Sequence, residues 1–278
     1  MVNDPREAVE SFIKKAGASE AYALATVVWT RNATSAKPGA KAVITDSGDL
    51  IGWVGSSCVQ GAVRKVGQEV LKSGEAKMIR VKPKEDVSSS HDEDGVELHK
   101  SGCPSKGTSD IFIEAVIPRS QLVVCGNSFV ARSLAELGAA VGFDVIQAAP
   151  GLEAASEGRL RVLQDFEFSD VERLEQSYWV VATQGARDRD ALSAALAQDA
   201  PYIAFVGSGR KMATLKKALL ESGASTERLE QLICPAGLDL GSVEPAEIAL
   251  SILAQIIQIR HAKSDKRSEP GRGAAQCA

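Results

Sequence analysis

The stretch that most limits what this chain can fold into is residues 122–131, LVVCGNSFVA. Its first four residues are apolar and suit a buried strand, a turn follows at Gly126, and apolar residues then recur at helical spacing. Further along, apolar runs alternate with helical stretches; these runs are 145–146, 179–182 and 202–206. Strands that alternate with helices predict a parallel sheet wound by right-handed crossovers. Residues 119–263 are therefore predicted to form a Rossmann-like domain.

The first half of the chain has a different pattern, in which short apolar runs follow one another with turn residues between them. Helices are expected over 6–16 and from about Val59 to Gly74, where valines recur at helical spacing. The strands expected here are 22–29, 42–45, 50–54, 77–81 and 111–116. The polar stretch 82–100 is expected to be a mobile surface insertion.

These patterns predict an α/β protein of two domains. An N-terminal α+β domain would span 1–118, a boundary would fall at Pro118, and the Rossmann-like parallel-sheet domain would follow at 119–263. Residues 264–278 are charged and lack apolar periodicity, so they are expected to form a disordered tail.

Charge and apolar content exclude several classes of protein. The formal net charge of −4 argues against sequence-independent binding to nucleic acid, which requires a surplus of Lys and Arg. The most apolar stretch, 248–259, is interrupted by polar residues and is shorter than a spanning helix, so no membrane span is expected. The chain opens with charged residues instead of a secretion signal, and we expect it in the cytoplasm. It contains no nucleophile elbow, zinc-protease motif or P-loop, which argues against a conventional hydrolase.

The turn at Gly126 approximates the glycine fingerprint that binds dinucleotides. In the full fingerprint a second glycine lets the backbone approach a pyrophosphate at a helix N-terminus, but Ser128 stands at that position. The carboxylate expected about 20 residues further on to bind ribose is missing, because residues 145–150 read VIQAAP. Three interpretations stay open: NAD(P) binding, binding of another phosphate-bearing ligand, and a Rossmann domain without a working pocket.

A second candidate site is the turn formed by Gly55, Ser56, Ser57 and Cys58 at the start of a predicted helix. Amide groups there can hold an anion, and the helix dipole favours a thiolate that binds metal or sulfur. Cys103 lies in another loop of small residues and could sit nearby. The alternative is that Cys58 is a small buried apolar residue.

Two further loops follow the predicted strand 202–206. Gly207, Ser208 and Lys211 stand at the carboxyl edge of the expected sheet, where glycines and cations suit a phosphate. The alternative is that this loop only starts a helix and its basic residues are solvated. Asp239, in the loop before the last helix, is either an acidic group of the site or a loop cap.

Taken together, these motifs resemble the XdhC/CoxI family of accessory proteins for molybdenum hydroxylases such as xanthine dehydrogenase and carbon monoxide dehydrogenase. The resemblance spans about residues 21–259. It is carried by the runs 25–28 (ATVV), 35–42 (SAKPGAKA), 52–60 (GWVGSSCVQ), Cys103 with 111–114 (IFIE), Gly207, Ser208, Lys211, and 235–241 (PAGLDLG) with 245–252.

The resemblance implies a non-catalytic chaperone that binds molybdenum cofactor while a cysteine-desulfurase-like partner exchanges its terminal oxo ligand for sulfide, and that then delivers it to an apo-hydroxylase. The cargo would be molybdopterin, in a cytosine dinucleotide form if the chain belongs to the CoxI-type branch. The soft thiols Cys58 and Cys103 would contact molybdenum. Contacts to the rest of the cofactor would come from Gly55, Ser56, Ser57, Gln60, Gly126, Ser128, Gly207, Ser208, Lys211 and Asp239.

The family also implies a homodimer. Two other functions stay open at this point. One is an NAD(P)-dependent oxidoreductase that uses the Gly126 turn, and the other is a scaffold that joins the hydroxylase to the sulfur donor without binding cofactor.

Overall fold

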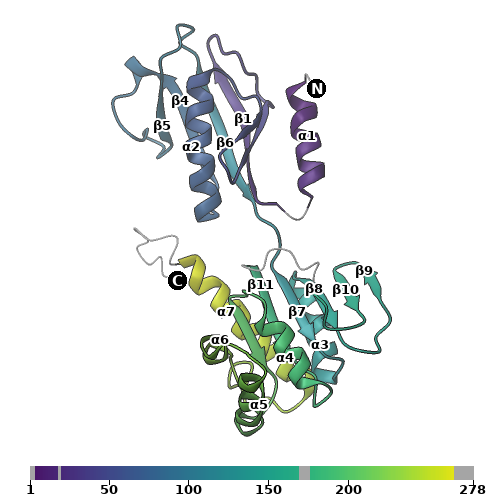
Figure 1. The fold of residues 1–278 in the computed structure, drawn as a ribbon. Helices are drawn as coiled ribbons and strands as arrows, with labels where there is room; N and C mark the ends of the chain where they lie inside the picture. The colour runs from purple at the N-terminus through teal and green to yellow at the C-terminus, as the bar shows by residue number, and fades with distance from the viewer. Residues whose placement is uncertain (1–3, 18–19, 169–175, 266–278) are drawn as a thin grey trace. The chain divides into compact units, whose positions relative to one another are not determined.

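The computed structural model describes residues 4–17, 20–168 and 176–265 (Figure 1). The chain divides into two compact units, with the division between Pro118 and Arg119. Residues 266–278, which make up most of the predicted tail, lie outside the described part.

The first unit is a six-stranded sheet with a helix on each face. Its helices are α1 (Pro5–Ala16) and α2 (Ser57–Ser73). Its strands lie in the order β3-β2-β1-β6-β4-β5, with bounds Leu50–Gly52, Lys41–Thr45, Tyr22–Arg31, Thr108–Val116, Lys77–Pro83 and Glu97–Ser101. All neighbouring pairs are antiparallel except β4 with β5, which is parallel.

The alternation of side chains along β1 explains why both faces of this sheet are covered. Ala23, Ala25 and Val27 point to the face where α2 packs its valines, whereas Tyr22 and Leu24 point to the face covered by α1. Helix α2 ends where predicted, because Gly74 adopts the left-handed conformation and its N–H bonds to the Val70 carbonyl at 2.8 Å.

The expectation for residues 82–100 is wrong in part. This stretch contains a short 3-10 helix, η1 (Lys84–Asp86), and contributes most of β5, an edge strand of the sheet. Arg80 anchors the loop before β5 by an ion pair with Asp92 at 2.8 Å, and the same guanidinium also bonds to Asp110. Strand β3 is shorter than predicted, since it ends at Gly52 and Trp53 and Val54 follow it without regular structure.

The second unit confirms the predicted parallel sheet. Its order is β12-β11-β7-β8-β10-β9, with bounds Tyr202–Phe205, Ser177–Val181, Gln121–Cys125, Asp144–Ala148, Leu160–Leu163 and Ala155–Glu157. Only the edge strand β9 runs antiparallel to its neighbour. Strands β9 and β10 were not predicted from the sequence.

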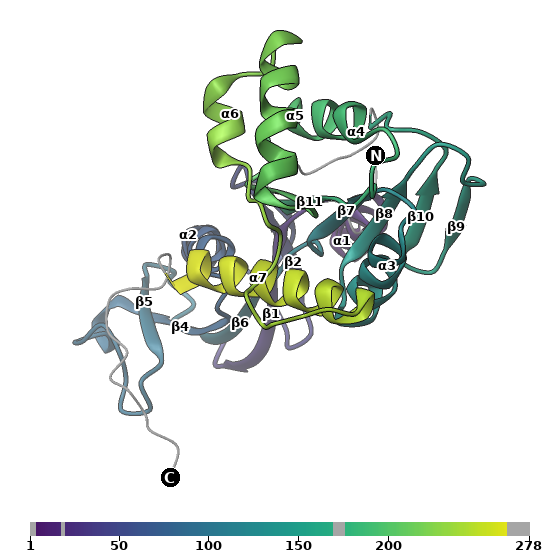
Figure 2. The same ribbon diagram turned by 90° about the horizontal axis from the view of Figure 1, so that it is seen from below.

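Helices cover both faces of this second sheet (Figure 2). α3 (Phe129–Val141) and α7 (Pro245–Asp265) lie side by side on one face. α4 (Asp188–Leu196), α5 (Gly209–Glu221) and α6 (Thr226–Gln231) pack on the other, around the buried Trp179 and Phe205. None of the helices in the described part of the chain is long and apolar enough to cross a membrane.

Strand order fixes where this sheet can present a ligand site. The chain leaves β7 towards β8 on one side, and β11 lies on the other, so the direction of winding changes between β7 and β11. In open parallel sheets, ligands bind beyond the carboxyl ends of the strands at this point. The turns after β7, β11 and β12 lie at that edge, and they contain Gly126, Thr183 and Gly207.

Candidate functional site

The structure brings Cys58 and Cys103 together in the first unit. Cys58 lies in the first turn of α2, whose N-cap is Ser56, and Cys103 lies in the loop between β5 and β6. Hydrogen bonds with the side chains of Ser56, Ser101 and Cys58 hold the pKa of the Cys103 thiol below its ordinary value. Both cysteines are partly exposed and reduced. The site is thus a pair of accessible thiols surrounded by hydroxyl groups.

Gly107 allows the loop between β5 and β6 to approach the loop 33–36 closely. A Cβ atom added at Gly107 would lie 2.5 Å from the Ala33 carbonyl oxygen and 2.6 Å from the Thr34 methyl carbon. The shared hollow measures about 30 Å³ and is lined by Ser56, Cys103 and neighbouring hydroxyl side chains. It is therefore large enough for a ligand atom on a metal, but not for an organic cofactor.

Other residues expected at this site stabilise the turn itself. Gly55 has φ +132°, which a residue with a side chain rarely adopts, and the Gln60 amide donates to the Gly55 carbonyl at 2.9 Å. Ser57 is exposed at the first position of α2. Ser101, which the sequence reasoning missed, also orients Cys103, because its hydroxyl accepts the Cys103 backbone N–H at 3.2 Å. A serine two residues before a cysteine is the only local signal that could have indicated this contact.

At the Gly126 turn of the second unit, the polar groups have partners within the protein. The Ser128 hydroxyl caps α3 by accepting the Ala131 N–H at 3.1 Å, and it donates to the Ala182 carbonyl at 2.6 Å. A Cβ atom at Gly126 would lie 2.4 Å from that same carbonyl, so this glycine allows the turn after β11 to pack close by. The side chain of Gln147, near the end of β8, donates to the Gly126 carbonyl at 3.0 Å. An amide thus stands near the position where a dinucleotide fingerprint has a carboxylate.

Lys211 is engaged by a buried carboxylate that the sequence reasoning missed. Its ammonium lies 2.5 Å from Asp188, which also bonds to the Thr183 hydroxyl and accepts the Gly185 N–H at 3.0 Å. Burial tends to raise the pKa of Asp188, but the hydrogen bonds from Lys211, Thr183 and Gly185 bring it below its ordinary value. Ser208 is the N-cap of α5 and accepts the Lys211 N–H at 3.3 Å. Lys211 therefore stabilises the turn after β11, because it pairs with the carboxylate that holds this turn.

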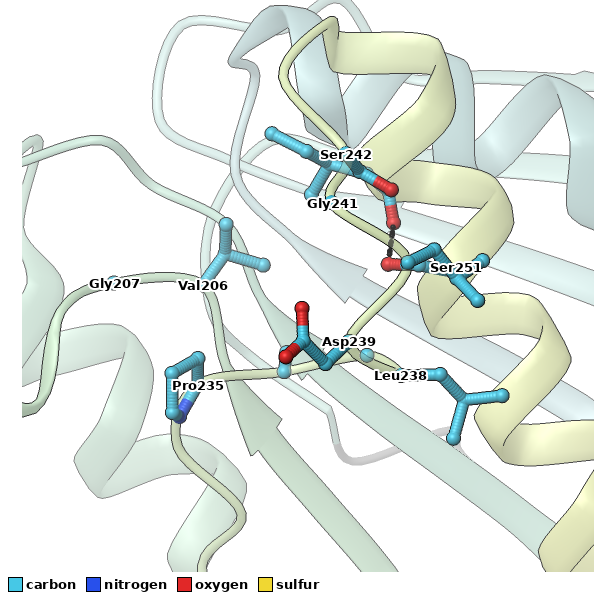
Figure 3. Close-up of a pocket in the computed structure, with 12 residues that line it drawn as sticks. Val206, Gly207, Pro235, Leu238, Asp239, Gly241, Ser242 and Ser251 are labelled. Atoms are coloured by element: carbon cyan, nitrogen blue, oxygen red, sulfur yellow. Dashed lines mark hydrogen bonds between the residues drawn. The ribbon is translucent and has the colours of Figure 1, made fainter.

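The remaining predicted residues, Gly207 and Asp239, meet at a pocket of about 600 Å³. It lies between the end of β12, the loop 235–242 and the first turns of α7 (Figure 3). The Asp239 carboxylate projects into the space between Pro235 and Ser242. The wall is mostly apolar and is completed by Val206, Leu238 and Ile248.

The Gln255 side chain and the close packing of Gly237 fix the wall of this pocket. The amide of Gln255 on α7 accepts the Gly237 N–H at 3.1 Å, donates to the Gly237 carbonyl at 3.2 Å and accepts the Tyr202 hydroxyl at 2.7 Å. Gly237 has φ +97°, and a Cβ atom there would lie 2.4 Å from the Ser251 hydroxyl. The loop is therefore held tightly against α7.

Two family models match this chain. The XdhC and CoxI family matches residues 16–82, and the XdhC Rossmann domain matches residues 122–256. The thiol of Cys58 lies within the first match, and Gly126, Gly207 and Asp239 lie within the second.

Curated relatives and a solved structure are also similar. The chain is 26% identical over 247 residues to the uncharacterized protein YqeB of Escherichia coli (strain K12), covering 86% of this chain and 44% of that protein. It is 28% identical over 161 residues to a probable xanthine dehydrogenase subunit of Bacillus subtilis (strain 168), covering 55% of this chain and 47% of that protein. The chain thus spans about half the length of these relatives. A crystal structure described as a xanthine dehydrogenase from Bacillus halodurans covers 94% of this chain and 96% of its own, with 17% identity and a TM-score of 0.44.

Proposed function

Because this chain belongs to the XdhC and CoxI family, we propose that it is an accessory protein of a xanthine dehydrogenase-type hydroxylase that holds molybdenum cofactor as cargo. In this proposal the cofactor is molybdopterin or its cytosine dinucleotide form. The protein holds it during sulfuration by a cysteine-desulfurase-like partner, then passes it to the apo-hydroxylase. The chain itself catalyses no step.

The observation that carries this proposal is the pairing of Cys58 and Cys103. Thiolates are the protein ligands that soft, sulfur-bound metals prefer, and a lowered pKa gives more thiolate at neutral pH. Neither thiol is buried, so a cargo molecule can reach both.

The surroundings of the thiols also suit the metal end of the cofactor. The hollow of about 30 Å³ beside Cys103 can accept a terminal oxo or sulfido ligand, and the hydroxyl groups around it can donate hydrogen bonds to that ligand. Such contacts are reversible, as transfer to a client enzyme requires.

The proposal is tested by incubating the full chain with molybdenum cofactor released anaerobically from a hydroxylase. Gel filtration separates the protein, and mass spectrometry measures the molybdenum that it retains. We expect wild type to retain molybdenum and the Cys58→Ser and Cys103→Ser variants to retain at least tenfold less. Cys234→Ser is the matched control, because Cys234 is a partly buried thiol of the second unit that bonds to the Gly207 carbonyl.

The outcomes separate the parts of the proposal. Equal retention by wild type and both site variants would exclude the thiol contacts. If wild type retained no molybdenum, the cargo function itself would be wrong.

A further inference from the structure

The first unit contains a second, larger pocket next to the thiol pair. It measures about 330 Å³ and lies between the N-terminus of α1, the segment 35–41 and Trp53. This volume is at the lower end of the range of about 300–1,000 Å³ that is typical of small-molecule sites. We call it the Trp53 pocket.

The Trp53 pocket and the hollow beside Cys103 are neighbours. Ser35 lines both of them. Trp53 itself lies two residues before Gly55, which lines the hollow together with Ser56. A molecule whose reactive end lies at Cys103 can therefore extend along Ser35 into the larger pocket without leaving the first unit.

Positive charge is concentrated in this pocket. Arg6, Lys37 and Lys41 line it together with a single carboxylate, Asp4, although the whole chain has a net charge of −4. Among the described residues, no carboxylate forms an ion pair with any of these three cations. Asp4 itself is engaged as the N-cap of α1 and accepts the Arg6 backbone N–H at 2.8 Å. The N-terminal end of the helix dipole adds further positive potential.

Trp53 gives the pocket an aromatic wall. Trp53 is 38% exposed, which leaves ring surface for a ligand. Cations beside an exposed indole suit a ligand that combines phosphate with a planar heterocycle, because the ring stacks while the cations neutralise the phosphate.

We infer that the Trp53 pocket binds the phosphate-bearing heterocyclic part of a nucleotide-type ligand. This inference rests on the proposed function, since that ligand would be the part of the cofactor that lies beyond its metal end. Lys37 and Lys41 contact the phosphates, and Trp53 contacts the heterocycle. The hollow at Cys103 cannot hold this part of the cargo because its volume is only about 30 Å³.

The inference is tested without molybdenum, by calorimetric titration of the full chain with cytidine diphosphate, cytidine and inorganic pyrophosphate. We expect cytidine diphosphate to bind at least tenfold more tightly than either fragment, and more weakly at high salt. Lys37→Gln, Lys41→Gln and Trp53→Ala should each weaken binding at least tenfold. Lys14→Gln, an exposed lysine in the last turn of α1, should leave it unchanged.

The result that would overturn the inference is no binding of cytidine diphosphate at millimolar concentration, or binding that none of the three variants affects. Cys58→Ser should bind cytidine diphosphate like wild type. If the nucleotide fails to bind while wild type still retains molybdenum through its thiols, the inference is wrong and the proposed function stands. If the nucleotide binds through these residues but wild type retains no molybdenum, the inference about the Trp53 pocket stands and the cargo function is wrong.

Discussion

The Cys58 thiol lies close enough to the Cys103 thiol to help lower its pKa, although the two side chains come from different elements of the first unit. Helix α2 positions one of them, and the loop between β5 and β6 positions the other. The meeting of these elements turns two separate cysteines into a single site.

The first prediction concerns the reactivity of Cys103 with iodoacetamide. The hydrogen bond with Ser56 is the largest cause that lowers its pKa, so removing this bond should raise the pKa and reduce the thiolate present at neutral pH. We expect Ser56→Ala to move the pH midpoint of alkylation upward and to slow the reaction several-fold at pH 7. Peptide mass mapping over a pH series measures this for each cysteine separately.

Two controls accompany this measurement. Ser105→Ala changes a hydroxyl that lines the same hollow but does not lower the Cys103 pKa, so it should leave the midpoint in place. Cys125 is fully buried, and burial raises its pKa, so it should stay unmodified in the folded protein. An unchanged midpoint in Ser56→Ala would show that this hydrogen bond does not control the thiol.

A second prediction concerns the loop that carries Cys103. Gly107→Ala places a methyl group 2.5 Å from the Ala33 carbonyl oxygen, so the two loops must separate. We expect a loss of about 1–3 kcal/mol in the free energy of unfolding, as is typical of overpacking, and slower alkylation of Cys103. Urea unfolding and the same mass mapping provide the measurements.

Gly102→Ala is the matched control for this loop. A Cβ atom there meets nothing within 4 Å, and its φ is not in the left-handed region. Equal stability of the two variants would contradict the close packing of the two loops.

A third prediction concerns Asp188 and its bond to Lys211. The folded-state pKa of Asp188 is lowered, so its charged form contributes stability at pH values above its ordinary pKa of 3.8, and that contribution is lost as the pH falls through the folded-state pKa. Asp188→Asn should therefore cost about 1–3 kcal/mol at neutral pH, because the partners of a buried carboxylate are left poorly matched. The difference from wild type should shrink at acid pH, as measured by urea unfolding at several pH values.

Asp190→Asn provides the comparison. Asp190 also stands in the first turn of α4, but its ion pair with Arg187 is exposed, and such pairs contribute about 0–1 kcal/mol. The role assigned to Asp188 would be wrong if both variants lost the same stability at neutral pH.

Much of the fold could be predicted from the sequence, since the buried strands of the second unit are continuous apolar runs and α2 shows a clear helical period. Two of the strands that were missed, β5 and β9, have no such signal. β9 is fully exposed, and β5 contains the polar residues Glu97, His99 and Lys100 because it lies at an edge of its sheet. Neither strand has an alternating apolar face, so apolar periodicity does not reveal them.

The candidate site was predictable residue by residue but not as an arrangement. Sequence reasoning identified Cys58 and Cys103 separately, because Cys58 follows small residues at the start of a helix and Cys103 lies among small residues in a loop. It could not identify Asp188 as the partner of Lys211, or the Ala182 carbonyl as the acceptor for Ser128, since both contacts join distant parts of the chain. These contacts depend on strand order, which local patterns do not determine.

The last prediction concerns the loop that forms the wall of the 600 Å³ pocket. Gln255→Ala removes three hydrogen bonds and leaves the Tyr202 hydroxyl and both backbone groups of Gly237 without this partner. We expect a loss of about 1–3 kcal/mol in the free energy of unfolding and faster proteolytic cleavage within 235–242. Gln258→Ala, an exposed position on the same helix, should change neither measurement.

Because Tyr202→Phe removes only one of the three bonds, this variant should lose less stability than Gln255→Ala. The double variant should lose less stability than the sum of the two single variants. Fully additive losses would mean that the Tyr202 hydroxyl and the Gln255 amide do not act together.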